Sequence, residues 1–417
     1  MTASEVRIRS VPWRALRRLA LELEPALELV LGGHPAERVV DRFLRDHRGL
    51  GREGREAAAE AIFGVGLWRR RLAWHATAGA ERDGGLPPLA LLAALVRDLG
   101  GVAPGEAEEI AGLRPGALRA PTSPPSDPAT RFSLPDWLWE TLVREAGAEA
   151  EALADALNLP GPICLRPNLL RTSPQALAAR LAGEGVATRP GELVTSALLV
   201  TSGRPNVLGL ASHRDGLFEV QDEGSQLVAA LLDAQPGEAV LDLCAGAGGK
   251  TLQLAAAVGA SGTVHATDID AGRLARLRTR AARAGASGIV RVHGASPPPG
   301  LSVDRALVDA PCSELGVLRR GPDLRFRLDP ESFDRLPPLQ LALVARAAAH
   351  VRPGGRLVYA TCTLRREEDE NVALAFERAH PEFVRATDAR TCGGFVRTWP
   401  HRHGCDGFFA AAWQRAS

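Results

Sequence analysis

Lysine is almost absent from this sequence. Of the 50 basic residues, Lys250 is the only lysine and the rest are arginine. It stands in a glycine-rich segment, VLDLCAGAGGKT. An ammonium is a compact point charge with three donors, which the planar guanidinium fork of arginine does not reproduce in a tight pocket. The place of the lone lysine therefore indicates a functional position.

Long apolar runs, a signal segment and paired cysteines are also missing. The stretch to Leu31 is broken by Arg and Glu, and no run of about 18 apolar residues occurs, so we expect neither secretion nor a membrane span. The cysteines form no CxxC pair and no disulfide framework, which predicts free thiols in a reducing, cytoplasmic compartment. The net charge of +1 gives no bulk signal for nucleic acid or membrane, so any such surface must be local. The cysteines are Cys164, Cys244, Cys312, Cys362, Cys392 and Cys405.

The pattern along the 417 residues predicts several domains. Residues 1–120 have helical spacing interrupted by glycines, which indicates a small helical bundle. Residues 121–130 contain PTSPPSDP and form a linker, because so many prolines continue neither helix nor sheet. Residues 131–217 mix helix and strand as a small α+β unit. Residues 218–417 alternate strands with helices, as in a parallel sheet.

Arginines in the first segment permit two interpretations. They could form a basic face, or they could belong to an ordinary solvated helix surface. The residues concerned are Arg14, Arg17, Arg18 and Arg69 to Arg71.

Two cysteines each follow an apolar run that is typical of a buried parallel strand. Cys312 follows RALVDAP, and Cys362 follows RLVYAT. In a doubly wound sheet, ligands bind outside the carboxyl ends of the strands, so both thiols are candidates for chemistry. The alternative is that they are small buried hydrophobic residues, as free cysteines usually are.

The segment from Asp242 to Thr251 reads as a strand, a glycine-rich turn and a helix start, and three ligands compete for it. A Walker A phosphate loop would need glycine at Cys244, and a dinucleotide fingerprint would need glycine at Thr251. The remaining ligand is S-adenosylmethionine, with its carboxylate and amino group at the turn. By the logic of nucleotide folds, an acid after the next strand would hold its ribose. Asp268 suits that role, with Asp270 as the alternative.

From about Phe218 to Phe409 the sequence resembles the RNA (cytosine-5)-methyltransferase family. A Pro-Cys and a Thr-Cys in this order and spacing are a specific signature of that family. The helical start and the α+β extension further resemble its bacterial, RsmB-like branch, which methylates small-subunit ribosomal RNA and has an N-terminal domain like that of the antitermination factor NusB. The segments that carry the resemblance are QDEGSQL (221–227), DLCAGAGGKT (242–251), ATDID (266–270), DAPCSELGVLRRGPDLR (309–325), YATCT (359–363), EEDEN (367–371) and DGFF (406–409).

The resemblance implies an α/β fold: a Rossmann-like S-adenosylmethionine-dependent methyltransferase domain, preceded by an α-helical NusB-like domain and a small α+β extension. It implies that Cys362 adds to carbon 6 of cytosine and that Cys312 assists release, although related DNA enzymes use the Pro-Cys thiol for attack. Asp309 would bind the N3 edge of the base. Lys250 would face the base and could lower the pKa of a neighbouring thiol.

The partners implied are RNA and no membrane, and the protein is expected to be a monomer. Because carbon 6 is reached only in an unstacked base, the target would be a loop or a flipped base. Arg319, Arg320, Arg325 and Arg327 could contact phosphates or pair with Asp323 and Asp329. The residues assigned to the cofactor are Asp242, Cys244, Ala245, Gly246, Gly248, Gly249, Lys250, Asp268, Asp270, Arg273 and Asp309.

The sequence also departs from the family pattern. Ala295 stands where the family usually has an aspartate near the adenine amino group, and Gly246-Ala247 replaces Ala-Pro. The loss of that acid leaves a second hypothesis open, a weak or silent RNA-binding assembly factor, and a transfer RNA substrate is a further alternative. No metal is expected, because the spacing of Cys392, His401, His403 and Cys405 matches no standard zinc pattern.

Overall fold

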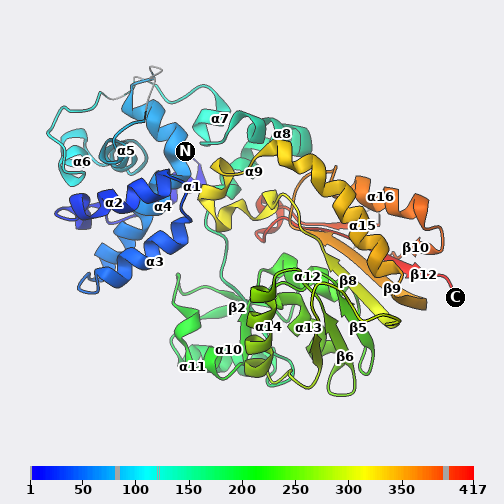
Figure 1. Cartoon of the computed structure of the whole chain (residues 1–417). Helices are drawn as coiled ribbons and strands as arrows, with labels where there is room; N and C mark the ends of the chain where they lie inside the picture. The colour runs from blue at the N-terminus through cyan, green and yellow to red at the C-terminus, as the bar shows by residue number, and fades with distance from the viewer. Residues whose placement is uncertain (1, 80–84, 120, 122, 388–393) are drawn as a thin grey trace. The chain divides into compact units, whose positions relative to one another are not determined.

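The computed structural model describes residues 2–79, 85–119, 121, 123–387 and 394–417. Two compact units make up the chain (Figure 1). The first consists of Met1–Pro160 with Val317–Pro330, and the second of Gly161–Gly316 with Glu331–Ser417. Among the described residues, no helix combines the length and the apolar character that crossing a membrane requires.

The first unit is helical, as predicted for residues 1–120. Its central helix α4 is packed against α2, α3 and α5. Apolar residues at helical spacing make this core, such as Leu23, Leu27 and Val30 of α2 and the fully buried Trp68 of α4. The helices are α1 (Ala3–Arg9), α2 (Ala20–Leu31), α3 (Ala36–Asp46), α4 (Arg52–Ala76), α5 (Pro88–Ala94), α6 (Pro104–Ile110), α7 (Pro128–Arg131), α8 (Asp136–Ala146) and α9 (Ala150–Leu157), with short turns η1 (Trp13–Leu16), η2 (Leu95–Leu99), η3 (Gly147–Glu149) and η6 (Pro322–Phe326).

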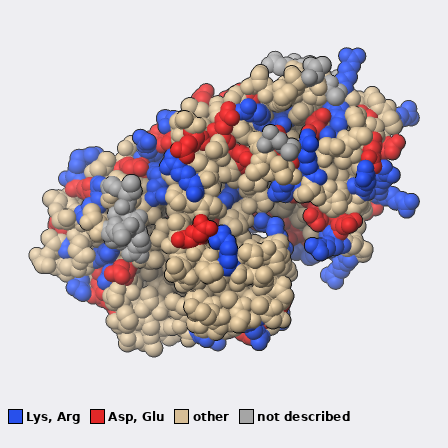
Figure 2. Space-filling model, turned by 180° about the vertical axis from the view of Figure 1, so that it is seen from behind, with Lys and Arg blue, Asp and Glu red and all other residues tan. Residues whose placement is uncertain are grey.

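The arginines of this unit are largely engaged with acids, which favours the helix-surface interpretation. Arg14 and Arg17 both bond to Glu106, at 2.8 and 2.7 Å. Other pairs join Arg70 to Asp127 and Asp136, and Arg71 to Glu5. On the face drawn in Figure 2, basic and acidic side chains are likewise interspersed, in keeping with the net charge of +1.

The second unit begins with the predicted α+β element. Its four strands form an antiparallel sheet in the order β2-β3-β1-β4, covered by α10 around a small core that includes Leu165, Leu177 and Phe218. The helices α7, α8 and α9, part of which was predicted with this element, belong to the first unit. The elements are β1 (Cys164–Pro167), α10 (Pro174–Gly183), β2 (Thr188–Pro190), β3 (Leu198–Val200), η4 (Val207–Gly209), α11 (Ala211–Arg214) and β4 (Phe218–Val220).

The larger sheet confirms the predicted α/β fold. The described strands run in the order β10-β12-β9-β8-β5-β6-β7, with β11 beside β12. Strands β5 to β9 are parallel, whereas β12 pairs antiparallel with β9, β10 and β11. The strands are β5 (Ala239–Asp242), β6 (Thr263–Ala266), β7 (Val290–Val292), β8 (Val303–Asp309), β9 (Val351–Thr361), β10 (Phe383–Arg385), β11 (Phe395–Arg397) and β12 (Phe409–Arg415).

Helices cover both faces of this sheet. One apolar core lies under α12, α13 and α14, and a second under α15 and α16. Strands β6 and β7 lie on one side of β5, whereas β8 and β9 lie on the other. The order in which strands are added to the sheet therefore reverses between β5 and β8, and ligands bind at such a switch point. The remaining elements are α12 (Glu223–Leu231), α13 (Gly249–Val258), α14 (Ala271–Ala284), η5 (Leu315–Arg320), η7 (Pro330–Arg335), α15 (Leu336–Ala348), α16 (Glu370–Ala379) and α17 (Pro400–His403).

Candidate active site

The glycine-rich turn joins β5 to α13 and is shaped by its glycines. Gly248, which precedes the first residue of α13, has φ +88°, and a Cβ there would lie 2.1 Å from Cδ1 of Leu277. Gly246 also has a positive φ, +54°. Only glycine adopts such angles freely, so the sequence forces a tight turn with its backbone open to a ligand.

Asp242 ends β5 beneath this turn and is 1% exposed. Its Oδ2 accepts a hydrogen bond from the Thr251 hydroxyl at 2.7 Å, whereas Oδ1 has no partner among the described residues. Burial raises the pKa of Asp242 to about 7. An unsatisfied buried carboxylate oxygen beside an open turn is suited to a ligand that brings a donor.

The two acids after β6 have different surroundings. Asp268 accepts hydrogen bonds from the backbone N–H groups of Gly246 (2.9 Å) and Asp270 (2.8 Å), which places its carboxylate against the glycine turn. Asp270 instead caps α14 by accepting from the N–H of Arg273 at 2.9 Å. Of the two, Asp268 is the one that faces the cavity.

The lone lysine forms an ion pair at the end of β8. Nζ of Lys250 lies 2.6 Å from Oδ2 of Asp309, and the side chains are 8% and 32% exposed. The ammonium also lies 5.2 Å from the ring centroid of Phe408. The short distance and partial burial fix both charged groups in a defined geometry.

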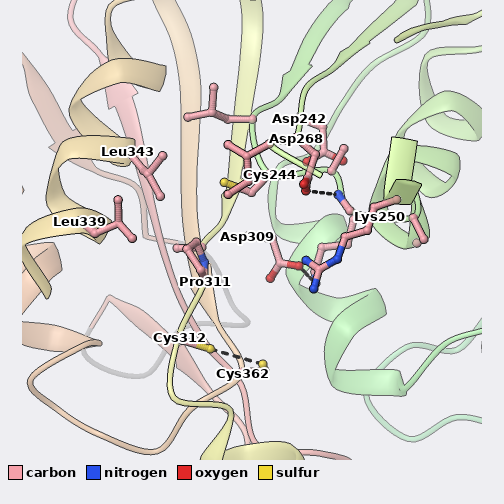
Figure 3. Close-up of a pocket in the computed structure, with 18 of the residues that line it drawn as sticks. Asp242, Cys244, Lys250, Asp268, Asp309, Pro311, Cys312, Leu339, Leu343 and Cys362 are labelled. Atoms are coloured by element: carbon pink, nitrogen blue, oxygen red, sulfur yellow. Dashed lines mark hydrogen bonds and ion pairs between the residues drawn. The ribbon is translucent and has the colours of Figure 1, made fainter. Parts of the chain in front are cut away.

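The two predicted thiols meet. Parallel pairing sets Asp309 of β8 opposite Ala360 of β9, so the residues that follow the two strands lie side by side. Sγ of Cys312 is 3.4 Å from Sγ of Cys362 (Figure 3). The hydrogen bond with Cys362 and burial raise the pKa of the Cys312 thiol well above its usual range.

A cavity of about 390 Å³ joins these groups, and Figure 3 shows Lys250 and Asp309 between the glycine turn and the thiols. It is lined by the predicted Asp242, Cys244, Ala245, Gly246, Gly249, Lys250, Asp268, Arg273, Asp309, Cys312 and Cys362. Burial raises the pKa of the Cys244 thiol to about 12, so that this third sulfur stays protonated. The departure at Ala295 also lies on this lining.

The residues fit S-adenosylmethionine. The open glycine turn suits a carboxylate, the unsatisfied Oδ1 of Asp242 suits an ammonium, and Asp268 has the position expected of a ribose ligand. Gly248 and Asp270 were predicted to bind the cofactor but do not line the cavity. Gly248 instead shapes the turn before α13, and Asp270 caps the start of α14.

Several lining residues were missed by sequence reasoning. Leu339 and Leu343 of α15 give the cavity an apolar side, and Ile269 is a further apolar lining residue. Ile269 is 88% exposed and Leu339 is 46% exposed. Exposure of large apolar residues at a cavity indicates a ligand surface, but helix periodicity alone does not mark it. Ser225, from the QDEGSQL segment, is a further lining residue without an assigned role.

One predicted phosphate contact is wrong. Arg325 is fully buried and donates hydrogen bonds to Oδ1 of Asn158 (2.6 Å) and to the carbonyl of Leu157 (3.1 Å), all within the first unit. Cys392, one of the residues considered as metal ligands, lies outside the described residues. Across the described ranges, no group of three or more His, Cys, Asp or Glu is placed to hold a metal ion.

Comparisons with known proteins point in one direction. A family model described as 16S rRNA methyltransferase RsmB/F matches residues 229–414, and one described as the ferredoxin-like domain of RsmF/B-like methyltransferases matches residues 134–206. The probable ribosomal RNA small subunit methyltransferase B of Synechocystis is 35% identical over 301 residues, which cover 69% of this chain and 68% of that protein.

Solved structures share the fold. The protein PH0851 is 26% identical with a TM-score of 0.78, over 97% of this chain and 99% of the other. A methyltransferase homologue from Pyrococcus horikoshii is 26% identical with a TM-score of 0.61, over 69% of this chain and 98% of the other.

Proposed function

This chain belongs to the RsmB/F family of 16S rRNA methyltransferases, and we propose that it methylates carbon 5 of a cytosine in small-subunit ribosomal RNA. The observation that carries the proposal is the pair of thiols, 3.4 Å apart, in one cavity with Asp309 and Lys250. Methylation at an oxygen or nitrogen needs no nucleophile from the protein, because the lone pair of the accepting atom attacks the methyl group directly. Carbon 5 of cytosine needs both addition at carbon 6 and later elimination, which gives two thiols separate tasks.

S-Adenosylmethionine is the methyl donor, and when bound it supplies a methyl group on a sulfonium, which is electrophilic. We assign its amino acid end to the glycine turn and Asp242, and its ribose to Asp268. The exposed Ile269 and Leu339 would cover its adenine. These residues bind and orient the donor, and they do not themselves react.

Cys362 is the proposed nucleophile. Its sulfur forms a bond to carbon 6, which places electron density on carbon 5 and makes that atom reactive toward the methyl group. The neighbouring Cys312 thiol retains its proton because its pKa is raised, and a protonated thiol is the weaker nucleophile. The raised pKa of Cys312 counts against attack by the Pro-Cys thiol, as in the related DNA enzymes, and so favours Cys362 as the nucleophile.

Asp309 and Lys250 are proposed to bind the base. Asp309 would bond to the N3 edge of cytosine, and a proton there makes carbon 6 more electrophilic. Lys250 holds the carboxylate at 2.6 Å and, by facing the base, adds a positive charge beside the developing negative charge. After methyl transfer, the proton on carbon 5 passes to water, its electron pair reforms the double bond between carbons 5 and 6, and the bond from carbon 6 to Cys362 breaks to leave a thiolate. Cys312, which has kept its proton and lies 3.4 Å away, would assist this release by donating a hydrogen bond to the departing thiolate.

Positive charge on the second unit supports an RNA substrate. Helix α14 carries five arginines, of which Arg280 and Arg283 pair with Glu219. Arg273, which lines the cavity, lies 3.6 Å from Asp270. Arg276 and Arg278 are exposed, as phosphate contacts need to be. Residues 1–120 would be a NusB-like RNA-binding domain and residues 131–217 an RNA-contacting extension, and the protein would act as a monomer.

Trapping of the covalent adduct tests the assignment of the thiols. The Cys312→Ala variant should accumulate a protein–RNA adduct that survives denaturing electrophoresis, because addition proceeds and release is impaired. Cys362→Ala should form none. The reverse pattern would exchange the two roles.

Bisulfite sequencing tests the reaction and the target. Ribosomal RNA incubated with protein and S-adenosylmethionine should gain one protected cytosine, which is absent with Cys362→Ala. Protection confined to transfer RNA would change the substrate and keep the chemistry. Failure to bind S-adenosylmethionine in calorimetry would leave the RNA-binding assembly factor as the function.

A further inference from the structure

A buried acid without a role in the reaction lies behind the two thiols. Glu368 is 0% exposed. Its Oε2 accepts hydrogen bonds from the backbone N–H of Ser313 (2.9 Å) and from Nε2 of Gln340 (3.0 Å). Its Oε1 accepts from the Ser313 hydroxyl (2.5 Å) and from Nη1 of Arg365 (3.3 Å). All four partners are donors, so the site fits a carboxylate and no uncharged side chain of similar size.

These contacts hold the Cys312 loop on both sides of the thiol. Ser313 follows Cys312 and is bound to Glu368 through its backbone and its hydroxyl. Pro311 precedes Cys312, and its carbonyl accepts a hydrogen bond at 2.9 Å from the same Gln340 amide that reaches Glu368. The backbone on either side of the sulfur is therefore tied to one carboxylate.

The same network reaches the second thiol. Oγ of Ser313 lies 2.6 Å from Oγ1 of Thr363, the residue that follows Cys362. Since the Ser313 hydroxyl gives its one hydrogen to Glu368, the Thr363 hydroxyl must donate to Ser313. A directed chain of hydrogen bonds thus runs from Thr363 through Ser313 to Glu368 and joins the residues that follow the two cysteines.

A backbone contact closes the Cys362 loop against the same segment. The N–H of Gly316 donates to the carbonyl of Cys362 at 2.9 Å, and a Cβ at Gly316 would lie 2.1 Å from the carbonyl oxygen of Gly407. Glycine is therefore required for this approach. The strands before the two cysteines are also joined, since the N–H of Ala310 donates to the carbonyl of Ala360 at 2.9 Å. Between these backbone contacts, the carboxylate network links the two loops through the side chains of Ser313 and Thr363.

We propose that Glu368 is a positioning residue that holds the Cys312 and Cys362 loops at the separation needed for addition and release. It touches neither base nor donor and acts through Ser313 and Thr363. The proposal rests on the proposed function for its purpose, but the geometry that it concerns exists without RNA.

Oxidative cross-linking measures that geometry apart from catalysis. The full-length protein, without RNA, is treated with diamide, and the disulfide between Cys312 and Cys362 is followed by mass spectrometry of peptides. Glu368→Gln presents an amide nitrogen to donors, which breaks the directed chain, and its cross-linking rate should fall about tenfold. The matched control is Glu382→Gln, since the Glu382 side chain is 44% exposed, pairs with His380 and makes no contact with the Glu368 network, so the rate should be unchanged.

Kinetics test the consequence. Glu368→Gln should lower kcat by about 100-fold through misplaced thiols, with the KM for RNA and the Kd for S-adenosylmethionine within about twofold of the unaltered protein. If Glu368→Gln does not fold, Ser313→Ala keeps the carboxylate and three of its donors and removes only the link to Thr363. It should lower both the cross-linking rate and kcat by about fivefold.

Outcomes separate the two proposals. Unaltered cross-linking in a folded Glu368→Gln or Ser313→Ala variant would overturn the positioning role, whatever the activity. An equal loss of kcat and of S-adenosylmethionine affinity would also overturn it, since it would indicate a general structural effect. If the unaltered protein methylates no RNA, the proposed function fails, and the cross-linking rates still decide the role of Glu368.

Discussion

The cavity has a buried carboxylate on each side, and the surroundings of the two differ. Asp242, below the glycine turn, has one oxygen bonded to Thr251 and one without a partner among the described residues. Glu368, behind the thiols, has both oxygens filled by four donors. Burial raises the pKa of Asp242 to about 7. A satisfied acid stabilises structure, whereas an unsatisfied one is tolerated where a ligand completes it.

The largest expected effect concerns stability. Glu368→Leu removes the acceptor of four buried hydrogen bonds, so it should lower the free energy of unfolding by about 3–5 kcal/mol. Asp242→Asn retains an oxygen for Thr251 and removes a buried charge, so near neutral pH it should not lower the free energy of unfolding. Urea denaturation near neutral pH measures both. Equal losses would contradict the distinction between the two acids.

The unsatisfied acid should also make stability depend on pH. The pKa of Asp242 is raised from 3.8 to about 7, so the folded state binds this proton more tightly than the unfolded state. Its contribution is complete below about pH 4 and disappears as the pH rises through 7, a decrease on the order of 4 kcal/mol at most. When the free energy of unfolding is measured by urea denaturation between about pH 4 and pH 7, Asp242→Asn should not show the decrease that ionisation of Asp242 causes. Parallel curves for the two proteins would show that Asp242 titrates normally.

Affinity for the donor should separate the acids after β6. Asp268→Ala removes the carboxylate that faces the cavity and should raise the Kd for S-adenosylmethionine by about tenfold or more in calorimetry. Asp270→Ala removes a helix cap, which should lower stability by about 1 kcal/mol and leave the Kd within about twofold. If the two effects on Kd were exchanged, Asp270 would be the ribose ligand.

The smallest expected effect is a gain. The N–H of Asp268 donates to the carbonyl of Gly294 at 3.1 Å, which places the neighbouring Ala295 close to the acid assigned to the ribose. Ala295→Asp would supply an acceptor for the adenine amino group and should lower the Kd for S-adenosylmethionine by about fivefold. An unchanged Kd would mean that position 295 does not meet the adenine.

The meeting of Cys312 and Cys362 could be predicted, because the end of a buried strand is marked by the residues next to it in the sequence. The apolar runs before Cys312 and Cys362 mark β8 and β9, and parallel pairing brings the residues after them together. The helical first unit and the strands of the α+β element follow from periodicity in the same way. The antiparallel strands β10 to β12 were not predicted, since the alternation of strands and helices was interpreted as a parallel sheet throughout and only the short α17 separates β11 from β12.

Burial of charged residues could not be predicted. Glu368 lies in EEDEN, which as a sequence is typical of a solvated surface, and only Ser313 and Gln340, distant in the chain, make it an interior acid. Arg325 was expected to be available to phosphates, yet Asn158 and Leu157 enclose it. In both residues the side chain is buried by tertiary contacts that no local pattern encodes.

Because the sequence has one lysine, limited proteolysis can measure how often the glycine turn opens. A lysine-specific endoprotease finds one cleavage point in this sequence, after Lys250, and a cut there separates β5 from most of α13. Lys250 is 8% exposed and lies in the first turn of a helix, so cleavage requires that turn to open. The rate at which two fragments appear therefore reports the local opening of the donor site, and a bound molecule that closes the turn slows it.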